Sequence, residues 1–334
     1  MPESDPLREK FEACLGKPLG AGGPSLAPDE VNLPMIRHWV DALDDRNPVY
    51  LDPEAAARSR FGGVVAPPAM LQTWTMARPR IEGIAERGGS PVEIDPNNPL
   101  RMLDDAGYVG TLATNSELEF VRYLRPGDRL RSATRMETIS ERKATGLGFG
   151  YFVTWSMTYE AEGGEVVGRQ LFRVLKFDPG TYGTARPEGG SRKKEPAPEP
   201  TGETLPPFEL NVTSTVIVSG AIASRDFMPV HHDPDYARAQ GAPDMFMNIL
   251  TTNGYVSRYV TDWAGPDAQL TNIEIRLGAP AIPGKTLRFT GRVARTREEA
   301  DLRVVEVAVQ AANELGNHAS GSVELTLPAS AGRG

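Results

Sequence analysis

The feature that most constrains this chain is a twelve-residue motif that occurs twice. Residues 45–56 read DRNPVYLDPEAA and residues 226–237 read DFMPVHHDPDYA, with an offset of 181 and identical residues at six of the twelve positions. In each copy an Asp-Pro pair, Asp52-Pro53 or Asp233-Pro234, is typical of a helix N-cap followed by proline at the first helical position. The repeat therefore predicts two halves with similar folds.

The order of the expected elements also repeats after each motif. A short apolar stretch that could start a helix (66–77 or 245–260) is followed by a Pro-Gly turn that opens a set of long strands. These strands are expected at 129–139, 149–160 and 166–177 in the first half and at 286–296, 302–313 and 318–327 in the second. The first half holds about 24 further residues, which we place within 82–110. A helix against an antiparallel sheet is an α+β arrangement, and two such halves suggest a pseudo-twofold pair with the sheets joined edge to edge.

A stretch rich in proline, glycine and charge separates the halves. Residues 178–206 contain almost no apolar side chain, so this segment cannot bury enough surface to offset the entropy of ordering it. We therefore expect a linker there. The 334 residues divide into an N-terminal extension (1–27), a first half (28–177), the linker (178–206), a second half (207–328) and a tail (329–334).

Composition argues against several classes of protein. The single cysteine, Cys14, allows neither a disulfide framework nor a cysteine-based zinc site. The formal net charge of −8 argues against nucleic acid or an anionic membrane as the main partner. No apolar run approaches the roughly 18 residues that span a bilayer, and the charged start MPESDPLREKF lacks the apolar region of a secretory signal. We expect a cytoplasmic protein that acts on a small-molecule substrate. We expect it to bind neither nucleic acid nor membrane.

The strongest candidate for chemistry is the second copy of the motif, which holds two of the chain's four histidines. Pro229 breaks the helical path between Asp226 and His231, so a loop can turn both side chains into one pocket. A carboxylate and an imidazole that face one water form an acid–base pair. The competing interpretations are that the carboxylate is a simple cap and that the histidine is polar surface.

The other polar residues have simpler interpretations. Asp233 is expected to cap a helix, and His232 to be a neighbour of the site. A metal site built from His231, His232 and Asp233 is disfavoured, because adjacent side chains seldom converge on one ion. His38 lies in a helical stretch and is expected to be structural, and His318 is expected to lie on a strand.

Residues 224–233, SRDFMPVHHD, resemble the signature of the MaoC-like (R)-specific enoyl-CoA hydratases, which is Gly-Asp, any residue, Asn-Pro, an aliphatic residue, His, any residue, Asp. The resemblance implies a double hot-dog fold, with a long helix against an antiparallel sheet in each half. It also implies that Asp226 and His231 are the catalytic residues. Arg225 and Met228 depart from the Gly and Asn of the pattern. In the first half Tyr50 stands in place of the histidine, and a side-chain pKa of about 10 makes it a poor substitute. We therefore expect the first half to be non-catalytic.

Residues 246–268, FMNILTTNGYVSRYVTDWAGPDA, also resemble the hydratase subunits of bacterial steroid side-chain degradation, in which two MaoC-like chains pair. The resemblance implies that the two are fused in this chain. The resemblance implies hydration of a trans-2-enoyl-CoA to the 3-hydroxyacyl-CoA, with no organic cofactor or metal and with CoA as part of the substrate. The backbone N–H of Asn248, at the expected start of a helix, is the candidate donor to the thioester oxygen. Val65, Ala66 and Pro68 are expected to line a tunnel for a bulky acyl group, although ordinary packing at a helix start would also explain them.

Three other functions stay open at this point. A 3-hydroxyacyl-acyl-carrier-protein dehydratase of fatty-acid synthesis would use the same motif in the reverse reaction. A hot-dog thioesterase would need a carboxylate but not His231. A non-catalytic acyl-CoA-binding module would fit the changes at Arg225 and Met228. Two fused halves already satisfy hot-dog pairing, and we expect a homodimer because dimers are the commonest assembly.

Overall fold

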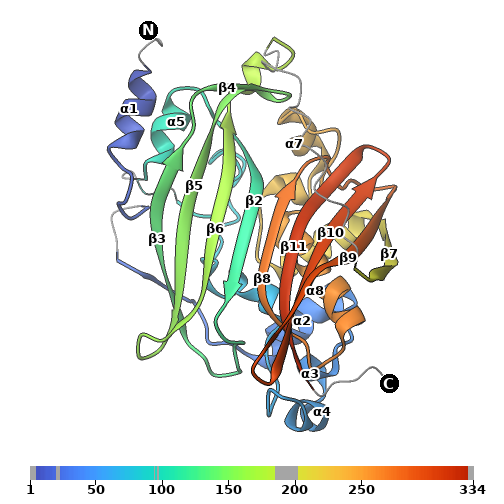
Figure 1. Cartoon of the computed structure of the whole chain (residues 1–334). Coiled ribbons are helices and arrows are strands. Elements are labelled where there is room, and N and C mark those ends of the chain that lie inside the picture. The colour runs from blue at the N-terminus through green and yellow to red at the C-terminus, as the bar shows by residue number, and fades with distance from the viewer. Residues whose placement is uncertain (1–4, 20–22, 94, 96–97, 185–201, 330–334) are drawn as a thin grey trace.

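The computed structural model describes residues 5–19, 23–93, 95, 98–184 and 202–329. They build one antiparallel sheet of eleven strands in the order β1-β3-β5-β6-β2-β8-β11-β10-β9-β7, with β4 paired to β5 off this path. Figure 1 shows the strands of the two halves side by side. The strands are β1 (Ser25–Leu26), β2 (Gly110–Phe120), β3 (Leu130–Ile139), β4 (Lys143–Thr145), β5 (Gly148–Ala161), β6 (Val166–Phe177), β7 (Thr204–Val212), β8 (Gln269–Leu277), β9 (Lys285–Glu299), β10 (Leu302–Asn313) and β11 (Gly316–Pro328).

The six strands expected from the sequence are confirmed to within a few residues as β3, β5 and β6 in the first half and β9, β10 and β11 in the second. Five strands were not expected: β2 and β8, which form the middle of the sheet, β7 at its edge, and the short strands β1 and β4. In β2 the alternation of apolar and polar residues is broken by a register shift between Ala113 and Asn115. A bulge of this kind turns successive side chains to the opposite face and hides the strand from a period-two search.

The two half-sheets join through β2 and β8, in the middle of Figure 1. Glu117 of β2 lies directly opposite Glu274 of β8, and these residues are 157 positions apart. The Pro-Gly turns that follow, Pro126-Gly127 and Pro283-Gly284, are also 157 positions apart. The Glu117–Glu274 pair therefore lies on the pseudo-twofold axis. The expected α+β double hot-dog fold, with its sheets joined edge to edge, is confirmed.

Helices pack around this sheet, and one long helix occupies the second half. The helix α8 spans 16 residues, most of which are buried. The helix α2 of the first half crosses it at Gly254, where a Cβ atom would collide with Leu43. Glycine is therefore needed at this close approach. The helices are α1 (Pro6–Glu12), α2 (Leu33–Leu43), α3 (Pro48–Leu51), α4 (Pro53–Arg58), α5 (Leu100–Asp105), α6 (Ser214–Ala223), α7 (Pro234–Ala239) and α8 (Ile249–Ala264), with short 3-10 turns η1 (Pro68–Met70), η2 (Thr73–Thr75), η3 (Pro179–Thr181) and η4 (Pro229–His231).

The helix expected at 66–77 is wrong, because this segment forms only the two turns η1 and η2. Two prolines explain the difference from α8. Pro67 stands 181 positions before Asn248, the N-cap of α8, and has no side-chain oxygen to cap a helix. Pro79 stands 181 positions before Val260, inside α8, where proline would break a helix. The first half therefore lacks the long central helix of its partner.

The boundaries differ from the expected ones at two places. The expected N-terminal extension takes part in the first half, because α1 buries Phe11 and β1 pairs with β3. The segment expected as linker is structured at both ends: η3 lies at one end, and β7 begins at Thr204 and buries Leu205 against β9 at the other. Residues 185–201 of the linker and 330–334 of the tail lie outside the described residues.

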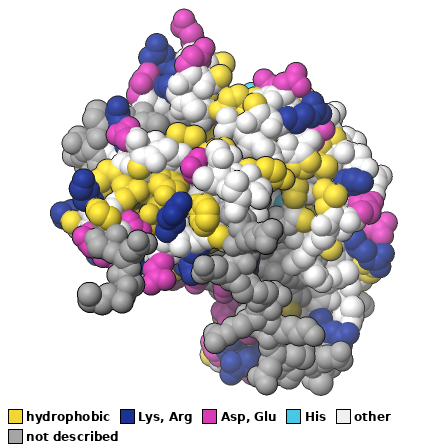
Figure 2. Space-filling view, turned by 90° about the horizontal axis from the view of Figure 1, so that it is seen from above, with side chains coloured by type: hydrophobic (Ala, Val, Ile, Leu, Met, Phe, Trp, Pro, Cys, Tyr) yellow, Lys and Arg dark blue, Asp and Glu magenta, His cyan; other side chains and the backbone are white. Residues whose placement is uncertain are grey.

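The end of the molecule that carries α1, α5 and α7 shows a mixed surface. Viewed from that end, hydrophobic side chains gather over the first half, and Lys, Arg, Asp and Glu side chains surround them (Figure 2). Among the described helices none is long and apolar enough to cross a membrane.

Candidate active site

The position of Asp226 is set by the end of α6. The Asp226 N–H donates to the carbonyl of Ala221 at 2.9 Å, and the Arg225 N–H donates to the carbonyl of Ile222 at 3.0 Å. These two bonds form a Schellman motif, which requires a left-handed residue just after the helix. Arg225 has this conformation, with φ +61°. The motif pattern has glycine here because glycine adopts this conformation without strain.

The position of His231 is set by the turn η4, which begins at Pro229 and ends at the histidine. The His231 Nδ1 atom lies 2.7 Å from the carbonyl oxygen of Phe246. A carbonyl can only accept, so Nδ1 carries a proton and Nε2 faces Asp226. Nε2 is 3.3 Å from Asp226 Oδ2, and the two side chains are only 7% and 13% exposed. The structure therefore brings the two predicted catalytic residues together in a nearly enclosed site.

Asn248 joins this pair through its side chain. Its Oδ1 caps α8 by accepting the N–H of Thr251 at 2.8 Å. Its Nδ2 donates to Asp226 Oδ2 at 3.0 Å and to Ser224 Oγ at 2.8 Å. Only the backbone N–H of Asn248 was predicted to take part in the site, and this amide contact was not expected. An asparagine before an apolar helix does predict a cap, but not a second bond to a residue 22 positions away.

The charges of the pair stabilise each other. Burial alone would raise the pKa of Asp226, but the facing His231 and the hydrogen bonds from His231, Asn248 and the Met228 N–H lower it below its usual value. Burial alone would lower the pKa of His231, but the charge of Asp226 and the bonds to Asp226 and Phe246 raise it. At neutral pH this arrangement favours a carboxylate beside an imidazolium.

The remaining polar residues of the sequence analysis lie as follows. Asp233 caps α7 by accepting two backbone N–H groups, as predicted. His232 is exposed beside the site, and partial burial lowers its pKa with help from His231. The predicted helix around His38 is confirmed, with His38 exposed on α2. His318 lies on β11, but it is buried, and its Nε2 is 3.0 Å from Thr252 Oγ1. Among the described residues no group of three His, Cys, Asp or Glu side chains is placed to hold a metal ion.

The first half repeats this backbone in detail. The Asp45 N–H donates to the carbonyl of Val40 at 2.8 Å, which matches the bond from Asp226 to Ala221. Asp44 is left-handed with φ +50°, as is Arg225. The same offset of 181 relates the Val65–Val49 bond of 3.3 Å to the Phe246–Val230 bond of 3.2 Å. The repeated motif of the sequence is therefore a repeated structure.

The side chains at the matching positions have lost the pair. Tyr50 stands where His231 does, is buried, and has a pKa raised well above its usual value by that burial. Burial also raises the pKa of Asp45 to about 6, despite a hydrogen bond from the Asn47 N–H. Pro67, at the position of Asn248, has neither an N–H nor an amide to offer. The first half thus holds a carboxyl group that has Tyr50 and Pro67 in place of the imidazole and amide of the second half.

Val65, Ala66 and Pro68 are all buried in the segment that leads into η1. The Ala66 N–H donates to the carbonyl of Leu124 at 2.8 Å. The turn η1 packs against α8. These residues therefore lie beside the central helix of the second half, and their contact with an acyl group stays a prediction.

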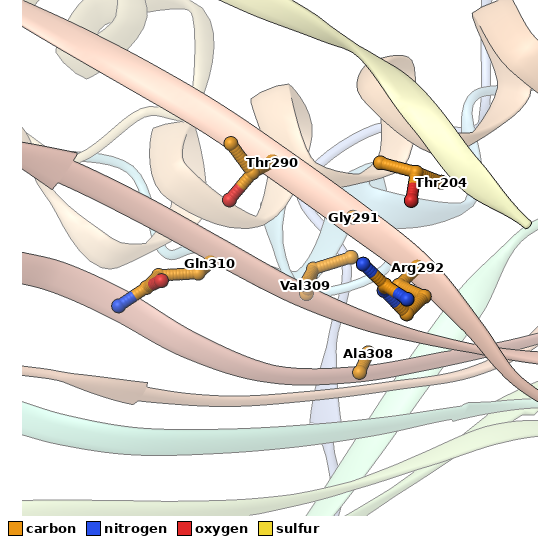
Figure 3. Close-up of a pocket in the computed structure, with 7 residues that line it drawn as sticks. All are labelled: Thr204, Thr290, Gly291, Arg292, Ala308, Val309 and Gln310. Carbon is orange, nitrogen blue, oxygen red and sulfur yellow. The ribbon is translucent and has the colours of Figure 1, made fainter. Parts of the chain in front are cut away.

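A separate surface hollow of about 310 Å³ lies on β7, β9 and β10. Figure 3 shows its lining residues, among which Arg292 and Gln310 are the largest polar side chains. None of Asp226, His231 and Asn248 belongs to this lining, and it contains no acid–base pair. The candidate active site is therefore the buried pair and not this hollow.

The fold and the buried pair define a class: a double hot-dog protein with an Asp–His pair in one of its two halves. Comparison with known proteins agrees. Residues 26–170 match the family described as FAS1-like, dehydratase domain region, and residues 197–315 match the MaoC like domain. The chain belongs to the MaoC-like dehydratase family.

Both subunits of one hydratase are similar to this chain. The 3-oxo-4,17-pregnadiene-20-carboxyl-CoA hydratase beta subunit of Mycobacterium tuberculosis is 46% identical over 126 residues, which cover 38% of this chain and 95% of that subunit. The alpha subunit is 42% identical over 164 residues, which cover 49% of this chain and 50% of that subunit. The chain thus spans about half the length of the alpha subunit. A solved MaoC-like dehydratase, 22% identical with a TM-score of 0.70, covers 95% of this chain and is itself covered to 99%, which shows the shared fold.

Proposed function

We propose that the chain hydrates a trans-2-enoyl-CoA to the 3-hydroxyacyl-CoA. The observation that carries this proposal is the contact of 3.3 Å between Asp226 and His231 at the N-terminus of α8. A buried carboxylate–imidazolium pair offers one group that accepts a proton and one that donates a proton, which is what addition of water requires. No organic cofactor or metal takes part in the proposed reaction, because CoA enters as part of the substrate.

In this proposal the Asp226 carboxylate accepts a proton from the water that attacks the β-carbon. The Nε2–H of the His231 imidazolium supplies the proton that the α-carbon gains. A C–O bond and a C–H bond form, the double bond becomes single, and the sum is one added water. Asp226 is then protonated and His231 neutral, and transfer of that proton across the contact between them restores the starting state.

The thioester oxygen gains negative charge in the transition state and needs a donor. The backbone N–H of Asn248 is our candidate, because an N-cap N–H lies at the positive end of α8 and outside the helical hydrogen-bond ladder. Losing one donor of this kind typically costs about 10²–10³ in rate.

A bulky acyl group is the second part of the proposal. Two observations support it: the first half lacks a long central helix, and the two similar Mycobacterium tuberculosis subunits are named for a steroid substrate. We propose that Val65, Ala66 and Pro68 contact this group. An Ala66→Leu substitution should then slow a steroid side-chain enoyl-CoA more than crotonyl-CoA, which kcat/KM for the two substrates would measure. Equal slowing of both would remove these residues from the acyl site.

The test of the reaction itself is mass spectrometry of the products formed by the purified protein. The two substrates are crotonyl-CoA and 3-oxo-4,17-pregnadiene-20-carboxyl-CoA. Addition of one water to the larger substrate alone is expected. Addition to crotonyl-CoA alone would keep the chemistry and contradict the bulky acyl group. No addition to either would contradict the proposal and would direct the search to acyl-carrier-protein substrates.

The assembly is also a proposal. We propose a homodimer of the fused chain, and light scattering of the purified protein should report twice the chain mass of 36.2 kDa. A single chain mass would contradict it. A cytoplasmic location stays a prediction.

A further inference from the structure

A chain of buried polar side chains crosses the boundary between the two halves. The Tyr159 hydroxyl donates to Gln170 Oε1 at 2.7 Å. Gln170 Nε2 donates to Gln72 Oε1 at 3.0 Å and to Ser116 Oγ at 3.1 Å. Asn253 Nδ2 of α8 donates to the same Ser116 oxygen at 3.2 Å. This hydrogen-bond network therefore links strands β5 and β6 of the first half to the central helix α8 of the second half, and it passes through β2, where the two half-sheets join.

One end of this network has no partner. Asn253 is 2% exposed, yet its Oδ1 makes no hydrogen bond within the described part of the chain. Ser116 accepts from two N–H groups, and no acceptor among the described residues is recorded for its own hydroxyl. Turning the Asn253 amide would pair one end of it with Ser116 and leave the other end free. As the side chain is placed, its Oδ1 end is the one that no described residue pairs.

Two further polar atoms without partners lie on the turn that replaces the missing helix. Thr73 Oγ1 and Trp74 Nε1, both on η2, make no hydrogen bond among the described residues although both side chains are buried. Their neighbour Gln72 belongs to the network and stands 181 positions before Asn253. The two amides are thus equivalent members of the two halves that meet near Ser116. Natural proteins rarely leave such buried groups unpaired, and a cluster of them at one place can mark a position where a ligand pairs with them.

The location fits the far end of an acyl group. Asn253 follows Asn248 by five residues on α8, which places it about 7.5 Å further along the helix axis. A substrate whose thioester lies at the start of α8 would extend past this point into the first half. If the acyl group were a plain hydrocarbon at this point, apolar side chains would be enough to bind it. A hydrocarbon therefore does not explain why polar side chains lie there.

We propose that Asn253, together with Thr73, binds a hydrogen-bonding oxygen on the far end of the acyl group, and that this site selects oxygenated ring substrates over hydrocarbon ones. The inference rests on the proposed function for the direction of the thioester. A ketone or a hydroxyl at that position pairs with the free amide end, because an amide can turn either its N–H or its oxygen to the ligand. A methylene group leaves the amide unpaired.

The test compares substrates that differ only in this oxygen. The three probes are 3-oxo-4,17-pregnadiene-20-carboxyl-CoA, its 3-hydroxy analogue and its analogue with a methylene at that carbon. Sites built to pair a substrate oxygen reject the analogue that lacks it strongly. We expect kcat/KM to be about 100-fold or more higher for the better oxygenated probe than for the methylene probe. Equal values would overturn the proposal.

The variants then assign the selectivity to residues. Asn253→Leu removes the amide at similar volume and should reduce the preference to within a few-fold. Thr73→Val should reduce it in part. Thr251→Val is the matched control, because Thr251 Oγ1 is another buried hydroxyl without a described partner but packs against Gly220 of α6. This control should leave the preference unchanged. An Asn253→Leu protein that slows all three probes equally would show a merely structural network and would overturn the proposal.

Binding of saturated thioesters separates this inference from the proposed reaction. Calorimetry with the 2,3-saturated forms of the same three probes needs no turnover. A tighter Kd for the oxygenated forms, lost in Asn253→Leu, would support the site even if no enoyl-CoA were hydrated. Equal Kd values, or no binding of any form, would overturn it. Hydration without oxygen preference would leave the proposed function intact and reject only this inference.

Discussion

The two halves of this protein share a backbone and differ in what it carries. Both end their first long helix in the same left-handed turn, and both follow it with the same pattern of main-chain hydrogen bonds. The second half places a His and an Asn within hydrogen-bonding reach of one Asp, whereas the first has Tyr50 and Pro67 at the positions of that His and Asn. Two substitutions therefore separate a half with an acid–base pair from one without.

The two aspartates show what the partner side chains do. Asp226 and Asp45 occupy equivalent, buried places, yet the pKa of Asp226 is lowered and that of Asp45 is raised to about 6. Burial acts in the same direction on both. The imidazole of His231 and the amide of Asn248 reverse the outcome for Asp226, and Asp45 has neither. The function of the aspartate is decided by its neighbours and not by the loop that holds it.

The largest expected effect is a loss of kcat when His231 is replaced. His231→Ala should lower kcat for enoyl-CoA hydration by about 10²–10⁴-fold, the usual contribution of a positioned acid–base group. Tyr50→Phe, the matched change in the first half, should leave kcat within about threefold, since Tyr50 has no acid–base role in this account. Initial rates with each purified variant measure both. A similar loss in both variants would mean that the two halves share the chemistry.

The next effect is on stability and concerns Asp45. Its raised pKa means that the folded protein holds a proton that the unfolded chain releases above about pH 3.8. This contribution is fully present below pH 3.8 and is lost as the pH rises through about 6. Asp45→Asn removes the titration, so its free energy of unfolding relative to wild type should rise by up to about 3 kcal/mol between these pH values.

Urea unfolding of wild type and Asp45→Asn at about pH 4 and pH 7.5 checks this prediction. Asp41→Asn, an exposed position on α2 four residues before Asp45, is the control and should show no such difference. An Asp45→Asn protein whose advantage does not grow with pH would mean that Asp45 is already ionised in the folded state.

Asn248 allows capping to be separated from catalysis. Asn248→Ser keeps an N-cap oxygen but cannot reach Asp226, so kcat should fall about 10–100-fold, as for loss of a hydrogen bond to a charged group. Stability should change little. Asn248→Ala should show the same fall in kcat, and its free energy of unfolding should also fall by about 1 kcal/mol because the N-cap is lost. The acid limb of kcat/KM against pH should move upward in both, because the Asn248 bond lowers the pKa of Asp226. An unshifted acid limb would place the amide outside the pair.

The smallest effect concerns the left-handed turns. Arg225→Gly should stabilise the protein by up to about 1 kcal/mol, because glycine tolerates the φ of +61° that strains arginine. Asp44→Gly should gain less, since aspartate adopts this conformation more easily. Thermal unfolding of the two variants compares them. A larger gain at Asp44 would mean that contacts of the arginine side chain outweigh the backbone strain.

Most of the fold and the core of the site could be predicted from the sequence, for physical reasons. The repeat fixed the two halves, and the alternating segments located six strands, because both signals are local. The strands β2 and β8 were missed because a register shift interrupts the alternation of each, between Ala113 and Asn115 in β2 and between Leu270 and Asn272 in β8. The helix at 66–77 was wrong because Pro67 and Pro79 outweigh an apolar composition.

Long-range contacts were beyond the sequence. Asp226 and His231 were found because they lie in one motif. The amide of Asn248 and the polar network around Ser116 join residues far apart in the chain, and no local pattern indicates them. His318 was placed on a strand, but its burial against Thr252 depends on the packing of α8 on β11.

The most direct test of the division between the halves is one rate comparison between two isosteric variants. Asp226→Asn and Asp45→Asn make the same chemical change at equivalent places, and the proposed hydration of an enoyl-CoA can be followed for both by product mass. The account predicts that Asp226→Asn loses hydration by at least about 10²-fold while Asp45→Asn keeps a rate near that of wild type. Full activity in Asp226→Asn, or equal loss in both variants, would contradict it.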